Sequence, residues 1–157
     1  MYQNKGFTLI ELVTTLAVAS ILLAIAIPMA SESLAGFQLN ASSARLAQDI
    51  RTVSQQSLTQ DYDYYYIQLY ADNNRYRIGD ILDSDNSRWV DLPGWVELDG
   101  SNFDLQRLSF SGKGKPITGG YIRLKNKNNN KFKYVIVAAI TGRVRVSDQP
   151  PLSNEYL

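Results

Sequence analysis

The chain has 157 residues, of which 45% are hydrophobic, and this is enough for one domain with a buried core. It contains neither cysteine nor histidine. Disulfide frameworks, thiolate metal sites and catalytic arrangements built on histidine are therefore excluded, and we expect a protein that is not an enzyme and carries no cofactor and no metal.

The net charge of +1 conceals two oppositely charged regions. Residues 1–104 hold 6 Lys/Arg against 13 Asp/Glu, whereas residues 105–157 hold 10 Lys/Arg against 2 Asp/Glu. This asymmetry predicts that the last third of the chain faces something anionic. The alternative is that acidic and basic faces offset each other within a single fold.

Residues 7–30 form a long apolar segment with few polar interruptions. At about 1.5 Å per residue, its 24 residues are long enough to cross a hydrocarbon layer about 30 Å thick. Lys5 precedes the segment, and no charge follows it until Glu32. The positive-inside rule therefore predicts a cytoplasmic N-terminus, with the bulk of the chain on the other side of the membrane.

Glu11 lies inside this apolar segment, and its charge argues against two simpler interpretations, a secretory signal and a plain membrane anchor. A cleaved secretory signal, with a small-x-small site at residues 24–26, and a plain membrane anchor would both place its carboxylate in lipid. A charge costs about 2.5–3.5 kcal/mol at the centre of a membrane helix and less near its end. We therefore expect Glu11 to have a partner.

Residues 5–18, KGFTLIELVTTLAV, resemble the N-terminus of a type IV prepilin or type II secretion pseudopilin. The resemblance implies a short basic leader, residues 1–6, which a prepilin peptidase removes after Gly6. Phe7 then becomes the first residue of the mature chain and is N-methylated, and Glu11 corresponds to the glutamate of the family. Pro28 falls where many pilins carry a proline that loosens the helix.

Removal of the leader would create a partner for Glu11. The new α-amine at Phe7 is largely cationic at neutral pH, and in lipid a charge is costly alone but tolerable when paired. The resemblance implies that Glu11 meets the amine of a neighbouring subunit and sets the axial register of a filament. Glu11 and Phe7 are thus the candidate assembly residues, and Gly6 and Phe7 the candidate processing residues.

Residues 31–60 continue in a helical pattern, in which Gly36 is expected to be a soft spot. Apolar or small residues recur at three- and four-residue steps: Leu39, Ser43, Leu46, Ile50, Val53 and Ser57. Polar residues fall elsewhere on the helix: Arg45, Gln48, Asp49, Arg51 and Gln55. The pattern predicts an amphipathic helix that packs against a sheet.

From residue 61 onward the pattern changes to the alternation typical of strands. We predict five to eight short strands, in the segments YDYYYIQLY, RYRIG, RWVDL, WVELDG, LQRLSFSG, YIRLKN, FKYVIVAAI and RVRVS. The most apolar of these, FKYVIVAAI, is predicted to be a central strand. The expected fold class is α+β: a long N-terminal helix, half membrane-spanning and half amphipathic, packed on an antiparallel β-sheet domain.

Three motifs suggest ligand chemistry, but each has a simpler explanation. The segment DILDSDNSRWVD has Arg88 and Gly94 where an EF-hand needs glycine and glutamate, so a solvated turn is favoured over a calcium loop. GKGKP lacks the frame of a phosphate-binding loop. The tyrosines within residues 62–66 are explained better by strand packing than by base stacking.

The closing hairpin, ITGRVRVSDQ, places Arg143 and Arg145 two residues apart on one face of a strand. Neighbouring arginines repel each other, so they usually have an anionic partner. Lys131 and Lys133 are among the basic residues just before this hairpin, and together the four are the candidate nucleic-acid contacts. The alternative is a pair of solvated arginines on an edge strand.

The segments ARLAQDIRTVSQQSL, LSF and TGRVRV resemble the GspH/FimT family of minor pilins, over most of the chain. The resemblance implies a structural subunit of a type IV pilus-type filament. Some FimT-like members are linked to DNA uptake through a C-terminal Gly-Arg-x-Arg element, which residues 142–145 match. GspH-like members are minor pseudopilins of type II secretion. The basic last third and the Gly-Arg-x-Arg match favour a type IV pilus subunit that contacts DNA, with the type II secretion pseudopilin as the alternative.

These expectations divide the chain into a cleaved leader (1–6), a transmembrane and assembly helix (7–30), an amphipathic half-helix (31–60) and an antiparallel β domain (61–157). The implied location is the bacterial inner membrane, crossed once, with a cytoplasmic N-terminus and a periplasmic C-terminal domain, and then a pilus or pseudopilus. The implied partners are other pilins or pseudopilins, the inner-membrane assembly platform, the prepilin peptidase, membrane lipid and, through the basic hairpin, DNA.

Overall fold

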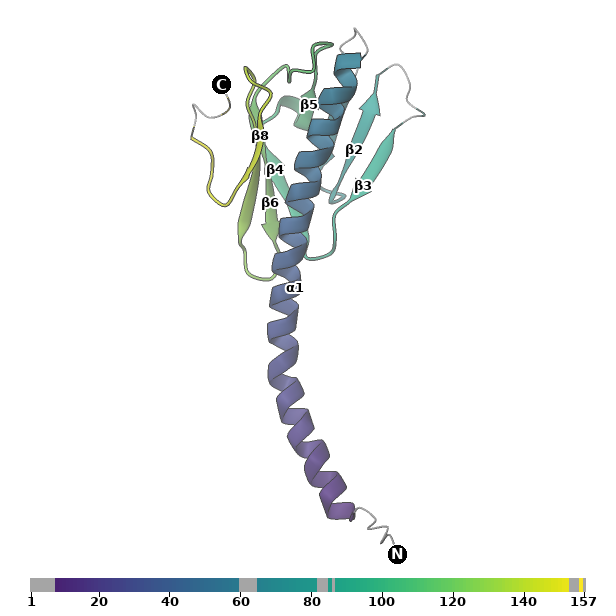
Figure 1. The fold of residues 1–157 in the computed structure, drawn as a ribbon, viewed down its shortest axis with the longest axis vertical. Coiled ribbons are helices and arrows are strands. Elements are labelled where there is room, and N and C mark those ends of the chain that lie inside the picture. Colours follow the sequence, from purple (N-terminus) through teal and green to yellow (C-terminus); the bar gives the residue numbers. More distant parts are fainter. Residues whose placement is uncertain (1–7, 60–64, 82–84, 86, 153–155, 157) are drawn as a thin grey trace, which may run out of the picture. The chain divides into compact units, whose positions relative to one another are not determined.

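The computed structural model of the chain describes residues 8–59, 65–81, 85, 87–152 and 156. Its contacts divide the chain into two compact units, Met1–Leu34 and Ala35–Leu157. Helix α1 (Leu9–Thr59) contributes its first part to one unit and its remainder to the other (Figure 1). Pro28 and Gly36 both lie within this helix, so neither residue interrupts it.

The first unit presents apolar side chains on every side of its helix. All residues from Thr8 to Ala30 are exposed, and Leu9, for example, has 81% of its surface accessible. The helix is long and apolar enough to cross a membrane, by length and composition. A helix that is apolar all round is typical of a segment surrounded by lipid or by other helices.

The hydroxyl groups of this apolar segment are bonded to its own backbone. Thr14 donates to the carbonyl of Ile10 at 2.8 Å, and Ser20 donates to the carbonyl of Leu16 at 2.8 Å. Thr15 donates to the carbonyl of Leu12 at 2.9 Å. These bonds satisfy the polar groups within the helix, as an apolar environment requires.

In the described part of the second unit, eight strands form two four-stranded antiparallel sheets. The first sheet has the order β3-β2-β1-β5 and the second the order β4-β6-β7-β8. The strands are β1 (Tyr65–Tyr70), β2 (Arg75–Asp80), β3 (Arg88–Asp91), β4 (Val96–Ser101), β5 (Arg107–Ser109), β6 (Gly120–Asn126), β7 (Phe132–Val137) and β8 (Val144–Ser147). The predicted α+β fold is therefore confirmed, and β7 is an inner strand as its apolar sequence indicates.

The core of this unit joins α1 to both sheets; in Figure 1, β2 and β3 lie to one side of the helix and β4, β6 and β8 to the other. Each residue of the apolar or small face predicted for α1 is less than 5% exposed, and Leu46 and Ile50 are fully buried. From the sheets, Ile67 and Leu108 of the first and Ile122 and Val135 of the second enter the same core. Burial of this helical stripe fixes α1 against the sheets.

One residue of α1 departs from the predicted pattern. Asp49 is expected on the polar side of the helix, but it is only 8% exposed. Its carboxylate accepts a hydrogen bond from the phenol of Tyr76 at 2.6 Å and forms an ion pair with Arg88 at 2.6 Å. Partners from β2 and β3, which α1 alone cannot reveal, make this buried carboxylate tolerable.

Candidate functional site: the N-terminal helix and the basic hairpin

Thr8 and Glu11 close the N-terminus of α1 with reciprocal hydrogen bonds. The backbone N–H of Thr8 donates to Glu11 Oε2 at 2.9 Å, and the backbone N–H of Glu11 donates to Thr8 Oγ1 at 3.3 Å. The hydroxyl of Thr8 also donates to Glu11 Oε2 at 2.8 Å. This arrangement is a capping box, which satisfies donors that the first turn of a helix leaves without partners.

Our reading of the sequence missed this capping box, although its signature is present. Thr8 and Glu11 stand three residues apart just before an apolar helix, which is the T-x-x-E pattern of a helix start. Glu11 therefore has a local structural role besides the assembly role predicted for it. Gly6 and Phe7, the candidate processing residues, lie outside the described residues.

The structure brings two of the four candidate nucleic-acid residues together. Arg143 and Arg145 line one surface pocket with Ile136 and Ala138. Gly142, whose φ of +66° suits glycine, turns the chain just before Arg143. Because β8 begins at Val144, Arg143 precedes the strand and only Arg145 lies within it. As an edge strand of its sheet, β8 leaves this basic hairpin accessible on one side.

The two lysines of the predicted surface lie elsewhere. Lys131 precedes β7, whereas Arg143 pairs with Ala138 just after β7, so the two are separated by about 23 Å of extended strand. Lys133 has a side chain only 19% exposed and forms an ion pair with Asp148 at 2.7 Å. Arg145 is half-buried and is itself engaged in an interaction within the chain. Of the four residues, Arg143 and Lys131 are fully on the surface.

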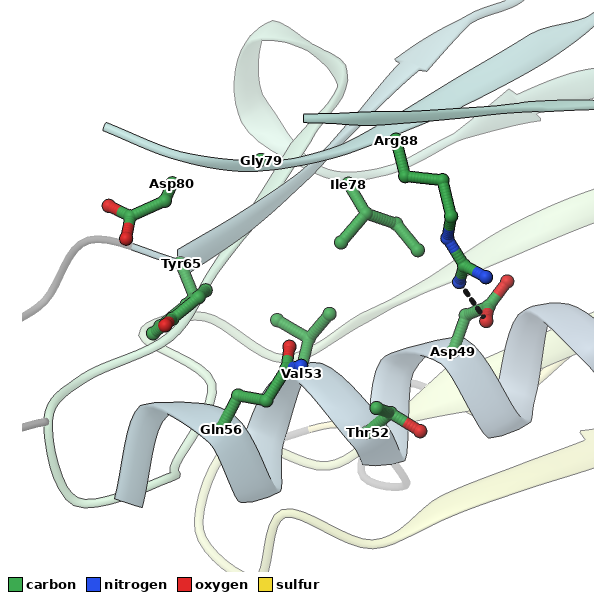
Figure 2. A pocket seen from close by; sticks show the side chains of 9 residues that line it. All are labelled: Asp49, Thr52, Val53, Gln56, Tyr65, Ile78, Gly79, Asp80 and Arg88. Atoms are coloured by element: carbon green, nitrogen blue, oxygen red, sulfur yellow. Dashed lines mark hydrogen bonds and ion pairs between the residues drawn. The ribbon is translucent and has the colours of Figure 1, made fainter. Parts of the chain in front are cut away.

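A cavity of about 320 Å³ lies between α1 and the first sheet, near Asp49. Figure 2 shows Val53 and Ile78 facing each other across it, with the Asp49–Arg88 pair at one end and Tyr65 and Asp80 at the other. Burial and then the hydrogen bond to Asp49 raise the pKa of Tyr76, so its phenol remains protonated and acts as a donor. Its bonds to Tyr76 and Arg88 show that Asp49 has a structural role: it links α1 to β2 and β3.

Two of the other sequence motifs, the tyrosine run and GKGKP, have simple structural explanations where the structure describes them. Tyr66 is buried and Tyr65 packs against the core, which agrees with packing as the role of the tyrosine run, while Tyr62 and Tyr64 lie outside the described residues. The phosphate-loop candidate is a tight turn, and Ser54 of α1 donates a hydrogen bond to the carbonyl of Gly114 in this turn at 2.6 Å. Residues 82–84 and 86 of the calcium-loop candidate lie outside the described residues. Among the residues that the structure describes, no group of three or more acidic side chains is placed to hold a metal ion.

Residues 1–27 match the family model of the prokaryotic N-terminal methylation motif. The chain carries a prepilin-type N-terminus. The match covers the predicted leader, the position predicted to be methylated and Glu11, and so agrees with the resemblance seen in the sequence.

The fold of this chain is similar to a solved structure, the minor pseudopilin EpsH from the type 2 secretion system of Vibrio cholerae. The TM-score is 0.55 at 14% sequence identity, and the likeness covers 70% of this chain and 96% of EpsH. A comparison with curated protein sequences finds no significant match. The chain thus joins a prepilin-type methylation motif to a pilin-like fold.

Proposed function

We propose that this protein is a minor pilin or pseudopilin, a non-enzymatic subunit of a type IV pilus-type filament. One observation carries the proposal: the methylation motif of residues 1–27 precedes a pilin-like fold in one chain. The protein is anchored in the bacterial inner membrane by α1, with its N-terminus cytoplasmic and its β domain periplasmic. Its partners are the prepilin peptidase, the assembly platform and other pilin-type subunits.

The geometry of the first turn supports an assembly role for Glu11. The carboxylate is held at the start of the apolar helix by Thr8, one turn from the position where cleavage would leave an α-amine. A fixed carboxylate in apolar surroundings attracts a cation strongly, because little water screens the pair. The amine of a neighbouring processed subunit is such a cation, and its pairing with Glu11 sets the register between subunits.

Mass spectrometry of the mature protein and a filament incorporation assay test this proposal together. We expect a mature chain that begins with methylated Phe7, and a Glu11→Ala variant that is processed and inserted normally but enters filaments poorly. An unprocessed N-terminus would contradict the pilin assignment itself. Normal incorporation of Glu11→Ala would leave that assignment standing but remove the role proposed for Glu11.

For the finer function, we propose that the filament is a type IV pilus and that the basic hairpin contacts DNA during uptake. Support comes from Arg143 and Arg145, which line one pocket at an edge strand within the strongly basic last third of the chain. The alternative is a GspH-like minor pseudopilin of type II secretion. The likeness of this fold to EpsH favours that alternative equally, because EpsH is a minor pseudopilin of such a system.

Titration of the full-length protein in detergent with labelled duplex DNA separates the two possibilities. Phosphate contacts predict an affinity that falls as salt rises and that is lost in the Arg143→Ala/Arg145→Ala double variant. Lys133→Ala is the matched control, because that lysine is already paired with Asp148 and its loss should change little. Absence of binding at low salt would favour the type II secretion pseudopilin.

A further inference from the structure

The outer face of the first sheet carries a cluster of arginines and aromatic rings that the proposed function does not use. Alternation along the strands places these side chains on the face opposite the core. The cluster, here the arginine–aromatic face, comprises Tyr66, Tyr70, Arg75, Arg77, Trp89 and Arg107. It draws one or more residues from each of the four strands of this sheet.

The guanidinium groups of this face lie on its aromatic rings. The Cζ atom of Arg75 is 4.2 Å from the centre of the Trp89 ring, and that of Arg77 is 5.7 Å from it. The Cζ atom of Arg107 is 4.3 Å from the centre of the Tyr66 ring. Cation–π contacts at these distances hold the guanidiniums in place before any partner arrives.

The surrounding backbone and side chains fix this arrangement further. Gly79 gives the Tyr66 ring room to lie on the sheet, because a Cβ atom there would come within 2.7 Å of that ring. Gln68 accepts a hydrogen bond from Nε of Arg107 at 2.9 Å, which orients the guanidinium. Tyr70 packs beside Trp89, with ring centres 5.0 Å apart.

The positive charge of this face is largely uncompensated. Among the described residues, neither Arg75 nor Arg107 forms an ion pair, and Nε of Arg75 is buried without a hydrogen-bond partner. Among the described residues of this face, the acidic one is Asp91, which lies opposite Arg75 in the strand register. Arg77 already has an interaction within the chain, but Arg75 and Arg107 outnumber this carboxylate and make the face complementary to an acidic partner.

We propose that the arginine–aromatic face docks a protein partner that presents carboxylates. Pre-oriented guanidiniums bind carboxylates through paired N–H groups, and Tyr, Trp and Arg are the residues enriched at the energetic centres of protein interfaces. The described strands of this sheet contain no lysine, a residue that protein interfaces disfavour. This inference goes beyond the proposed function, since neither the methylation motif nor the basic hairpin involves these residues.

The observations favour a protein over single-stranded nucleic acid at this face. Nucleic acids without sequence preference stack successive bases on open aromatic rings. Here the Tyr66 ring is 7% exposed beneath Arg107, and Arg75 covers one side of Trp89, so the face offers no series of open rings.

Trp89 can report occupancy of the face in the full-length protein. The chain has two tryptophans, and Trp95→Phe leaves Trp89 as the single reporter. The detergent-solubilised Trp95→Phe protein would be titrated with a synthetic heptapeptide of alternating glutamate and tyrosine, with its glutamine-for-glutamate counterpart, and with oligo-dT. We expect saturable, salt-sensitive quenching of Trp89 by the glutamate peptide and about tenfold weaker binding of the glutamine peptide.

Three further variants, each added to Trp95→Phe, locate the binding site. Arg75→Gln/Arg107→Gln should weaken binding of the glutamate peptide about tenfold or more, and Arg75→Lys/Arg107→Lys should also weaken it, because lysine keeps the charge but not the planar fork. Lys113→Gln, which removes an exposed charge outside the arginine–aromatic face, should leave the affinity for the glutamate peptide unchanged. Absence of saturable quenching, equal binding of the glutamine peptide, or tighter binding of oligo-dT would each overturn the proposal.

Discussion

Tyr76 donates a hydrogen bond of 2.6 Å to Asp49, and this bond ties β2 to the buried side of α1. Tyr76 is fully buried, and Asp49 is held from its other side by Arg88 of β3. Three elements therefore meet at one carboxylate. Because a buried polar group is costly without a partner, this network specifies how the helix lies on the first sheet.

Removal of the Asp49 carboxylate should destabilise the second unit. Asp49→Ala leaves the Tyr76 phenol buried without its acceptor, and we expect a loss of about 1–3 kcal/mol in the free energy of unfolding. The loss of the Arg88 pair adds little, because the Arg88 side chain is 57% exposed. Urea unfolding of the full-length protein in detergent measures this loss, and Asp72→Ala, at an exposed turn, is the control.

A double-mutant cycle would show whether the two residues act as a pair. If they do, Tyr76→Phe combined with Asp49→Ala should cost less than the sum of the two single substitutions. Additive costs would contradict the coupling that the short hydrogen bond indicates.

The raised pKa of Tyr76 predicts how stability depends on pH. Burial, then the hydrogen bond to Asp49, raises the pKa of this phenol above its ordinary value, so the folded chain keeps a proton that the unfolded chain releases above about pH 10. The folded state then binds more protons than the unfolded state, and its stability falls as the pH rises. The contribution is fully present below about pH 10 and is lost progressively above it.

Comparison of the wild-type protein with Tyr76→Phe isolates this effect from the other tyrosines and the lysines. Above about pH 10, the wild-type free energy of unfolding should fall more steeply, by up to about 1.4 kcal/mol per pH unit. Thermal unfolding followed by circular dichroism between about pH 8 and pH 11 provides the measurement. Parallel pH profiles for the two proteins would show that the phenol titrates normally in the folded state.

Thr8 and Glu11 allow the capping role of the glutamate to be separated from its charge. Glu11→Gln keeps a side chain that can close the capping box but removes the charge, whereas Thr8→Val keeps the charge but removes the cap. Loss of the cap should cost about 0.5–2 kcal/mol in local helix stability. If the charge directs assembly, the filament incorporation assay should show a large defect for Glu11→Gln and a small defect for Thr8→Val. A small defect for Glu11→Gln and a large one for Thr8→Val would show that Glu11 acts mainly in capping.

The sequence predicts the elements of this fold well because their periodicities are local. The apolar stripe of α1 and each strand segment can be read from spacing alone, and the buried face of α1 is the predicted one. The continuity of α1 through Pro28 is less easily foreseen. A proline removes one helical hydrogen bond, at the Ala24 carbonyl, and whether the helix nevertheless continues depends on its surroundings.

The candidate sites were predicted less completely, because they depend on which strands become neighbours. Spacing places Arg143 near Arg145, but only the register shows Lys131 at the far end of β7. The arginine–aromatic face is likewise invisible in the sequence, since Arg77 and Arg107 are 30 residues apart and share a face only because β1 lies between β2 and β5. Pairing between distant segments is the information that local patterns lack.

Asn74 shows the same limit, because it joins the two sheets from a turn. In the turn between β1 and β2 it adopts a φ of +51°, which asparagine tolerates. Its amide donates to the carbonyl of Val96 at 2.7 Å and accepts from the N–H of Leu98 at 2.8 Å. Both partners belong to β4, so a turn residue of the first sheet fixes an outer strand of the second.

Substitution of Asn74 should therefore cost more than substitution of a typical turn residue. Asn74→Ala loses both bonds to β4 and adds strain at a positive φ, for an expected cost of about 2–4 kcal/mol in the free energy of unfolding. Asn74→Gly loses the same bonds without the strain and should be about 1 kcal/mol less destabilising. Asn73→Ala, one residue earlier and exposed, is the matched control for urea unfolding. Equal stability of the Asn73 and Asn74 alanine variants would show that the two bonds contribute nothing to holding the sheets together.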